Sequence, residues 1–411
     1  MTYRDQHDIV FENINNSLLA IGSKIAASYY QKDENDNVTF NLPVINAIDI
    51  DWNNVYISDE VGNANTSGDI VYSVKLALEK CSDLYNQLAN DEVTIAAAGD
   101  KLAQLEEAIN NLKNLLEIEP ILMPNALIGS REVYEHPELR AKDLMDAFKD
   151  DSIKGIFTLT GGNDAIRILP YIDFDVIRNN PKVFMGFSDT TANHFMMYHA
   201  GLVSFYGPAA GVEFSLPEVP SVDVETVKNT IFSVNDELLL PHSGKYANDP
   251  LDWSTSILDI HDDKEYEVVQ GSGVVRGSLL GGCIDVFVSI NGTKIWPTLD
   301  EWKDKILFIE TSDEQPDPAL VKEVLQNMGV QGILGVIKGI IVGRPKNGKY
   351  YDEYNEVIKE VCRIFSRTDL PIISNGHFGH AWLWNVMPLG VEIEVDLENK
   401  KLTLLESGVE K

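Results

Sequence analysis

The chain has 411 residues and a formal net charge of −31, from 33 basic and 64 acidic side chains, which argues against a nucleic-acid or anionic-membrane partner because such binding depends on Lys and Arg. Its three widely spaced cysteines favour neither a disulfide framework nor a zinc site, and no signal-peptide pattern or membrane-spanning apolar run is present. We therefore expect a cytoplasmic protein of two or three domains that acts on a small molecule or peptide.

Residues 1–90 differ in texture from the remainder of the chain. They are rich in Asn and Asp, and residues 8–30 and 70–88 have helical patterns. Two interpretations of this N-terminal extension stay open: a small appended domain or oligomerisation arm, and an irregular extension packed on the main body.

Residues 91–235 alternate between expected strands and helices. Such alternation predicts a parallel sheet with helices on its faces, in which ligands bind beyond the carboxyl ends of the strands. We therefore predict a flavodoxin-like α/β domain. Strands are expected at residues 93–98, 153–159 and 183–185, an extended piece at 120–124, and helices at 101–116, 137–148 and 190–199.

Two glycine-containing loops follow strands of this domain. Ser188 lies in Gly186-Phe-Ser-Asp-Thr190, between a predicted strand and a predicted helix, as a nucleophile elbow would be built. The motif matches Gly-x-Ser-x-Gly only in part, and a helix N-cap serine is the alternative. The pair Gly161-Gly162 lacks the spacing of a dinucleotide-binding loop. Glycines there would let backbone N–H groups approach a reacting carbonyl oxygen.

Residues 236–270 are predicted to be a linker and substrate loop, interrupted by prolines and carrying Trp253. Residues 271–411 are predicted to form a smaller C-terminal α/β or α+β domain. Its strands are expected at residues 268–275, 278–280, 305–310, 339–342 and 371–374, its helices at 284–290, 319–328 and 354–365, a turn at Gly281-Gly282, and a closing hairpin at 391–395 and 401–405.

Three polar residues at predicted strand ends could form a catalytic triad. Ser188 needs a base, and an imidazole needs a carboxylate that holds its tautomer; His380 and Glu310 fill these roles. The residues alone favour His380 only slightly over His377, and His194 is expected to serve packing or polar support. Asp313 and Glu314 compete with Glu310, which closes an apolar strand and so has a fixed position.

Several short blocks, in this order, resemble the LD-carboxypeptidase and microcin C immunity (MccF-like) serine peptidases. The resemblance covers roughly residues 93–411, and its most specific blocks are 161–173, 180–182, 186–191, 205–208, Gly281-Gly282, 307–310, 378–380 and 388–390. Two departures stand out: the loop after the first strand is short, and residues 1–90 match no part of the family's pattern.

The resemblance implies specific roles for residues of this chain. Ser188 would be the nucleophile, Glu310 the triad carboxylate and His380 the general base. The backbone N–H groups of Gly162 and Asp189 would form the oxyanion hole, with the Asp189 side chain structural. Gly161, Asn163 and Trp253 would bind substrate. The family also implies a cytoplasmic homodimer without metal or cofactor.

The sequence thus predicts a serine peptidase or amidase that acts through an acyl-enzyme. The block 205–208 and the loop with Trp253 favour the immunity-like branch, which cleaves aminoacyl- or peptidyl-nucleotides and could stack an aromatic on a base. Two alternatives remain. One is a muramoyltetrapeptide LD-carboxypeptidase of cell-wall recycling, and the other is a catalytically silent binding protein whose acidic N-terminal segment faces a partner.

Overall fold

The computed structural model describes residues 31–32, 38–39, 104–128, 130–248 and 258–410. The chain divides into two compact units, residues 1–91 and 92–411. Of the first unit, the described part is an antiparallel pair of two-residue strands, β1 (Gln31–Lys32) and β2 (Val38–Thr39). The predicted helices at 8–30 and 70–88, the predicted strand at 93–98 and Trp253 lie outside the described residues.

The second unit begins with a four-stranded sheet of order β14-β5-β4-β3. Strands β3, β4 and β5 are parallel, as predicted, and β14 from near the C-terminus adds to β5 in antiparallel orientation. The short apolar run after Pro181 forms β4 because both faces of this strand are covered. The strands are β3 (Gly155–Phe157), β4 (Val183–Gly186), β5 (Ser204–Tyr206) and β14 (Met387–Leu389).

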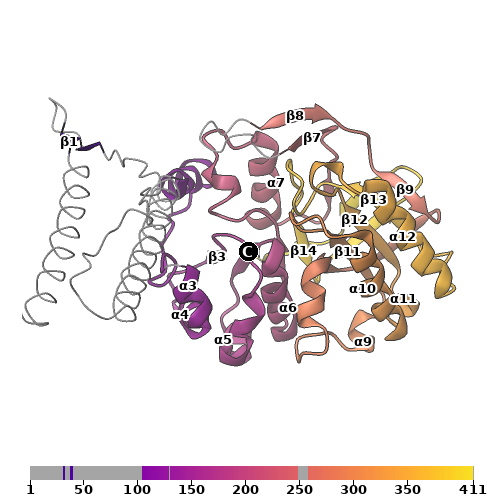
Figure 1. Ribbon diagram of the computed structural model, residues 1–411, viewed down its shortest axis with the longest axis horizontal. Coiled ribbons are helices and arrows are strands. Elements are labelled where there is room, and N and C mark those ends of the chain that lie inside the picture. Colours follow the sequence, from indigo (N-terminus) through magenta and orange to yellow (C-terminus); the bar gives the residue numbers. More distant parts are fainter. Residues whose placement is uncertain (1–30, 33–37, 40–103, 129, 249–257, 411) are drawn as a thin grey trace, which may run out of the picture. The chain divides into compact units, whose positions relative to one another are not determined.

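Helices cover both faces of this sheet, as Figure 1 shows. Phe184 and Tyr206 pack into a core with α4 and α6, whereas their neighbours Met185 and Phe205 pack with residues 104–116 and α7. This alternation follows the two-residue period of a strand. The helices of this region are residues 104–116, α3 (Ser130–Glu135), α4 (Pro137–Lys149), α5 (Phe174–Asn179), α6 (Thr191–Ala200) and α7 (Ser221–Ile231), with 3-10 turns at Ala165–Tyr171, Ser188–Thr190 and Glu213–Ser215.

An eight-stranded mixed sheet follows, of order β6-β16-β15-β10-β11-β12-β13-β9. Its centre, β10 to β13, is parallel, and the antiparallel hairpin of β15 and β16 confirms the predicted closing hairpin. The strands are β6 (Leu238–Leu240), β9 (Glu267–Gln270), β10 (Val274–Cys283), β11 (Lys305–Glu310), β12 (Gly339–Gly343), β13 (Ile372–Gly376), β15 (Glu392–Asp396) and β16 (Lys401–Leu404).

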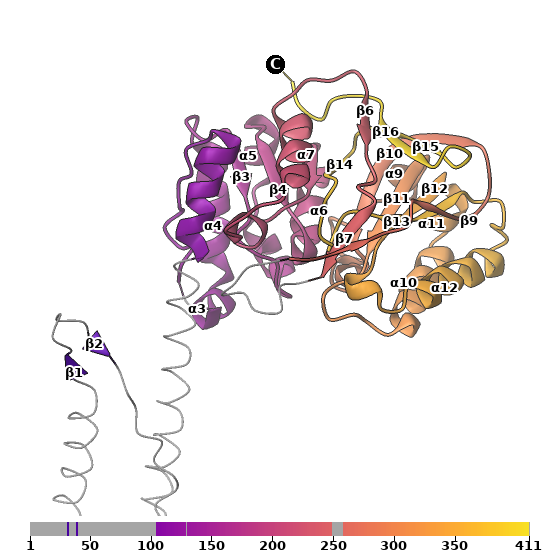
Figure 2. The ribbon, with the colours of Figure 1, turned by 90° about the horizontal axis from the view of Figure 1, so that it is seen from above.

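The helices of this part include α10 and α12, which lie side by side next to the sheet (Figure 2). Asp317 precedes helix α10, and its carboxylate caps the helix by accepting from the N–H of Ala319. The bounds are α8 (Phe287–Ile290), α9 (Leu299–Trp302), α10 (Pro318–Val330), α11 (Ile333–Val336) and α12 (Tyr351–Ile364), with 3-10 turns at Ile284–Val286 and Lys346–Gly348. No helix within the described ranges combines the length and apolar character needed to cross a membrane.

The segment 236–270, predicted to be a linker, contains regular structure instead. β6 and β9 belong to the eight-stranded sheet, and β7 (Lys245–Asn248) pairs with β8 (Asp259–Asp262) in a separate hairpin. Helix α7, just before this segment, was also missed. Its buried positions have helical spacing but include Asp223, Thr226 and Thr230, so the hydrophobic periodicity is weak.

The predicted turn at Gly281-Gly282 is also wrong, because β10 continues through both residues to Cys283. The glycines are required by close packing. A Cβ at Gly281 would overlap the carbonyl group of Phe308 on β11, and Gly282 has a φ of 144°. The extended piece predicted at 120–124 forms no strand.

Candidate active site

Ser188 lies on a tight turn between β4 and α6, as the elbow motif predicts. Its φ of 61° is in the left-handed region, which costs a non-glycine residue roughly 1–3 kcal/mol and is concentrated at functional sites. Gly186 permits the turn, since a Cβ there would overlap the Thr158 side chain. The sequence therefore forces the serine into a strained conformation at the carboxyl end of a parallel strand.

Ser188, His380 and Glu310 form a continuous chain of hydrogen bonds. The Ser188 hydroxyl lies 3.0 Å from Nε2 of His380, and Nδ1 of His380 lies 2.8 Å from Oε2 of Glu310. The backbone N–H of His380 also donates to this oxygen, at 3.2 Å. Three residues separated by 122 and 70 positions in the sequence thus meet in the order that proton transfer from serine to imidazole requires.

The surroundings of His380 favour its charged form. Burial lowers the pKa of the imidazole, but the Glu310 carboxylate and its hydrogen bond outweigh burial and raise this pKa above 6.5. Glu310 is 1% exposed. The carboxylate of the competing Asp313 lies 3.8 Å from Nε2 of His380, and the Asp313 side chain is 57% exposed. Glu310 is therefore the carboxylate placed to orient the ring.

Tyr206 is a member of this site that the sequence reasoning missed. Its hydroxyl donates to Oε1 of Glu310 at 2.5 Å and accepts the backbone N–H of Ser188 at 3.0 Å. Burial, followed by the charge of Glu310, raises the pKa of Tyr206 well above 10, so the phenol stays a donor. No strand was predicted at β5, and the signal that could have drawn attention to Tyr206 was its place in block 205–208 of the family resemblance.

The loop after β3 reaches the nucleophile directly. A Cβ at Gly161 would lie 2.8 Å from both Cβ and Oγ of Ser188, and Gly162 has a φ of 151°. The Asp189 side chain accepts the N–H of Ala165 at 2.7 Å, which ties the two loops together. The N–H of Ser188 already donates to the Tyr206 hydroxyl. An oxyanion formed in the site would therefore have to accept hydrogen bonds from other backbone N–H groups.

These residues open into a cleft of about 760 Å³. Gly161, Gly162, Asn163, Ser188, Asp189 and His380, all of them singled out from the sequence, line it, while Glu310 lies beneath it. The lining residues that were not anticipated include Glu213, Cys283, Asp285, Lys346, Trp382 and Trp384. The two tryptophans are only 4% and 2% exposed, so they pack the wall of the cleft.

His194 and His377 have partners other than Ser188 and Glu310. His194 is fully buried between the Ser204 hydroxyl, at 2.8 Å, and the Gly186 carbonyl, at 2.9 Å, and burial lowers its pKa to about 4. It supports β4 as a neutral ring. His377 contacts Asp263 instead, at 3.0 Å, in a second buried cluster.

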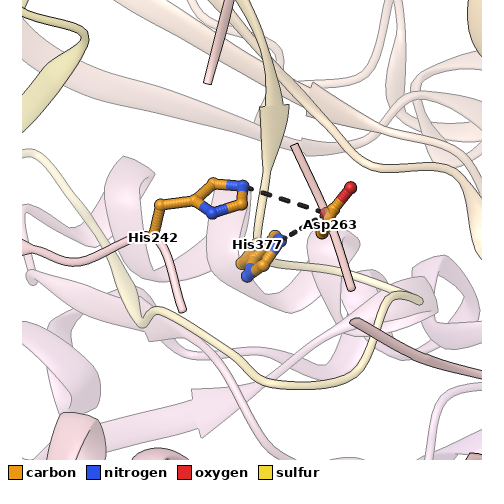
Figure 3. A group of neighbouring side chains, drawn as sticks. All are labelled: His242, Asp263 and His377. Carbon is orange, nitrogen blue, oxygen red and sulfur yellow. Dashed lines mark hydrogen bonds and ion pairs between the residues drawn. The ribbon is translucent and has the colours of Figure 1, made fainter. Parts of the chain in front are cut away.

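Figure 3 shows this second cluster, in which His242 and His377 converge on Asp263. Its three donor atoms lie within 4.8 Å of one another, and the same holds for Cys283, Glu310 and His380. Both groups therefore contain residue types that could hold a metal ion.

Two family models match stretches of this chain. Family models described as the LD-carboxypeptidase N-terminal and C-terminal domains match residues 79–207 and 276–395, so the match begins before the predicted start at residue 93. The probable murein peptide carboxypeptidase of Bacillus subtilis is 31% identical over 280 residues, 66% of this chain and 77% of that protein. The microcin C7 self-immunity protein MccF of Escherichia coli is 25% identical over 299 residues, 69% of this chain and 84% of that protein.

Solved structures give the same result. An MccF-like protein from Streptococcus pneumoniae in complex with AMP has a TM-score of 0.68 at 31% identity, with 74% of this chain and 93% of that chain covered. MccF in complex with aspartyl sulfamoyl adenosine has a TM-score of 0.59 at 25% identity, with 66% and 82% covered.

Proposed function

Since this chain belongs to the LD-carboxypeptidase family, we propose that it is a serine hydrolase that cleaves an amide bond through Ser188, His380 and Glu310. The observation that carries the proposal is the hydrogen-bonded chain from the Ser188 hydroxyl through His380 to Glu310, at 3.0 and 2.8 Å. The left-handed φ of Ser188 supports it, because strain of this kind persists only where surrounding structure imposes it.

In the proposed reaction, Nε2 of His380 takes the Ser188 proton as Oγ attacks the carbonyl carbon. Backbone N–H groups of Gly162 and Asp189 bind the resulting oxyanion. His380 then gives its proton to the leaving nitrogen, the C–N bond breaks, and an acyl-enzyme remains on Ser188. A water molecule, deprotonated by His380, releases the acid and restores the serine. Glu310 accepts the Nδ1–H throughout and stabilises the transient imidazolium.

An aminoacyl- or peptidyl-nucleotide is the proposed substrate. Two relatives at 31% and 25% identity bind AMP and aspartyl sulfamoyl adenosine. The cleft of about 760 Å³ is within the range of pockets that bury ligands of this size. We keep the proposed role of Trp253 in stacking on the base. Gly161 and Asn163 keep their proposed role of contacting the substrate beside Ser188.

A murein tetrapeptide is the second candidate, because the Bacillus subtilis relative at 31% identity is a probable murein peptide carboxypeptidase. Incubation with aspartyl sulfamoyl adenosine and, separately, with a muramoyl tetrapeptide, followed by mass spectrometry, separates the two. Release of sulfamoyl adenosine supports the first substrate, and release of D-alanine supports the second. A folded protein that cleaves neither and whose Ser188 is unreactive would be a binding protein.

Two further predictions accompany this function. We propose domain boundaries near residues 91 and 236, to be checked by limited proteolysis; a boundary near 271 would divide the eight-stranded sheet, because β9 pairs with β13. The homodimer stays a prediction. The molecular mass in solution, measured by light scattering after size-exclusion chromatography, tests it.

A further inference from the structure

Asp263 is the centre of a buried polar cluster on which His242 and His377 converge (Figure 3). It directly follows β8, and its side chain is 3% exposed. Its Oδ2 lies 3.0 Å from Nε2 of His377 and 3.8 Å from Nε2 of His242. The side chains of these histidines are 0% and 8% exposed, so all three side chains are buried.

Further contacts occupy both oxygens of Asp263. Arg344 donates to Oδ1 at 2.8 Å, and Asn375 donates to Oδ2 at 3.2 Å and to the carbonyl of Lys264 at 2.7 Å. Arg344 also donates to Oδ1 of Asn375 at 3.1 Å. Asn375 has a φ of 65°, so these contacts hold a strained residue at the end of β13.

The cluster has donor types suited to a metal ion, but its hydrogen bonds argue against one. Nδ1 of His242 accepts the N–H of Gly244 at 3.1 Å, and its Nε2 lies 3.2 Å from Nδ2 of Asn375, so both ring nitrogens already have partners. Burial and then His377 lower the pKa of His242 to about 4, so this ring is neutral. Asp263 and Arg344 therefore already balance each other's charge, and a buried divalent cation would leave the cluster with uncompensated positive charge.

The cluster is directly connected to His380 through the backbone. His377 precedes His380 by three residues, and its carbonyl accepts the N–H of Asn385 at 2.6 Å. Between them, Gly379 packs against Glu310 so closely that a Cβ would overlap the carboxylate. A small displacement of residues 375–379 would therefore change the distances from the His380 imidazole to both Ser188 and Glu310.

We propose that Asp263 is a positioning residue for His380. Its hydrogen bonds with His377 and Asn375 hold residues 375–379 in place, so that the His380 imidazole contacts both Ser188 and Glu310. It also joins this segment to the β7–β8 hairpin through its own position after β8. The inference rests on the proposed triad, and it assigns Asp263 no contact with the substrate.

Asp263→Asn tests the proposal, with the neighbouring Asp262→Asn as a matched control. The Asp262 side chain is 88% exposed and pairs with Lys245 at the surface. We expect Asp263→Asn to lower kcat and the rate of Ser188 labelling by a fluorophosphonate roughly tenfold or more, with KM nearly unchanged, because misplacement by about 1 Å can cost about 100-fold. Asp262→Asn should match the wild type. Equal behaviour of the two variants would overturn the proposal.

The pH dependence of labelling distinguishes positioning from a general loss of stability. The ionisable groups that face His380 are Glu310, Asp313, Lys346 and Asp285. If the ring moves away from Glu310, the pKa of His380 falls, so the labelling midpoint of Asp263→Asn should lie at lower pH than that of the wild type. A lower melting temperature with an unchanged midpoint would mean that Asp263 only stabilises the fold.

A second pair of variants remains informative if Asp263→Asn does not fold. His377→Gln keeps an N–H donor near the former Nε2 position, whereas His377→Ala removes it. We expect the glutamine variant to label much faster than the alanine variant; equal rates would contradict a role for the bond to Asp263. Failure of the proposed function is recognised separately, because wild-type Ser188 would then be unreactive.

Discussion

The hydroxyl of Tyr206 donates a hydrogen bond of 2.5 Å to Glu310, joining the end of β5 in the four-stranded sheet to the end of β11 in the eight-stranded sheet. The same oxygen accepts the N–H of Ser188 at 3.0 Å. One buried phenol thus fixes the proposed nucleophile and the proposed carboxylate relative to each other.

Tyr206→Phe should therefore reduce both activity and stability. It leaves an oxygen of Glu310 and the N–H of Ser188 without their partner, and an unsatisfied buried group costs about 1–3 kcal/mol. We expect kcat to fall on the order of tenfold to 100-fold and the melting temperature to decrease. Tyr171→Phe, at a ring that is 50% exposed, is the control; an active, fully stable Tyr206→Phe would refute the role of the hydroxyl.

The pH dependence of activity should reflect the raised pKa of His380. The reaction needs a neutral imidazole, so kcat/KM should fall as the pH decreases through a midpoint above 6.5. In Glu310→Gln the carboxylate charge is absent and burial, which lowers this pKa, dominates. The midpoint of residual activity should then move to lower pH. A profile that is identical in both proteins would exclude Glu310 as the partner that raises the pKa.

Gly161→Ala should block the site by steric overlap. The added Cβ would lie 2.8 Å from Oγ of Ser188, so we expect labelling of Ser188 and substrate turnover to fall strongly. Gly335→Ala adds a methyl group where no atom lies within 4 Å and serves as the control. Turnover near the wild-type rate in Gly161→Ala would mean that this loop does not approach the nucleophile in solution.

The stability of the protein should depend on Asp223. This buried carboxylate accepts the N–H of Trp384 at 2.6 Å, and its second oxygen has no partner among the described residues. Burial raises its pKa to about 7. Because the folded state holds this proton more tightly than the unfolded state, whose pKa is near 3.8, stability decreases as the pH rises from about 4 to about 7.

Asp223→Asn should remove that contribution. Its melting temperature should change less between pH 5 and pH 8 than that of the wild type, as thermal unfolding by circular dichroism would measure. A variant with the same pH dependence as the wild type would show that Asp223 titrates equally in both states.

The sequence predicted best the strands that are buried on both faces. β11 spans residues 305–310 as expected, because a covered parallel strand appears as a continuous apolar run. Helix α7 was missed because polar residues occupy three of its five buried positions. β6 was missed for a different reason: it has only three residues, in a region that prolines interrupt.

The site was predictable where a residue ends a strand, and unpredictable where a contact joins distant segments. Ser188 and Glu310 could be singled out by position, but the choice of His380 over His377 needed the family resemblance. The structure gives its physical basis: His377 binds Asp263, 114 positions away. Neither this bond nor that of Tyr206 to Glu310 has a local sequence signal.

The most direct test of the account is labelling with a fluorophosphonate, followed by peptide mass mapping, on the wild type, Ser188→Ala and His380→Ala. The proposed triad predicts a single modification at Ser188, absent from Ser188→Ala and greatly slowed in His380→Ala. Loss of the nucleophile should also reduce turnover on the order of a million-fold. Labelling at another residue, or none in a folded wild-type protein, would contradict the proposed triad.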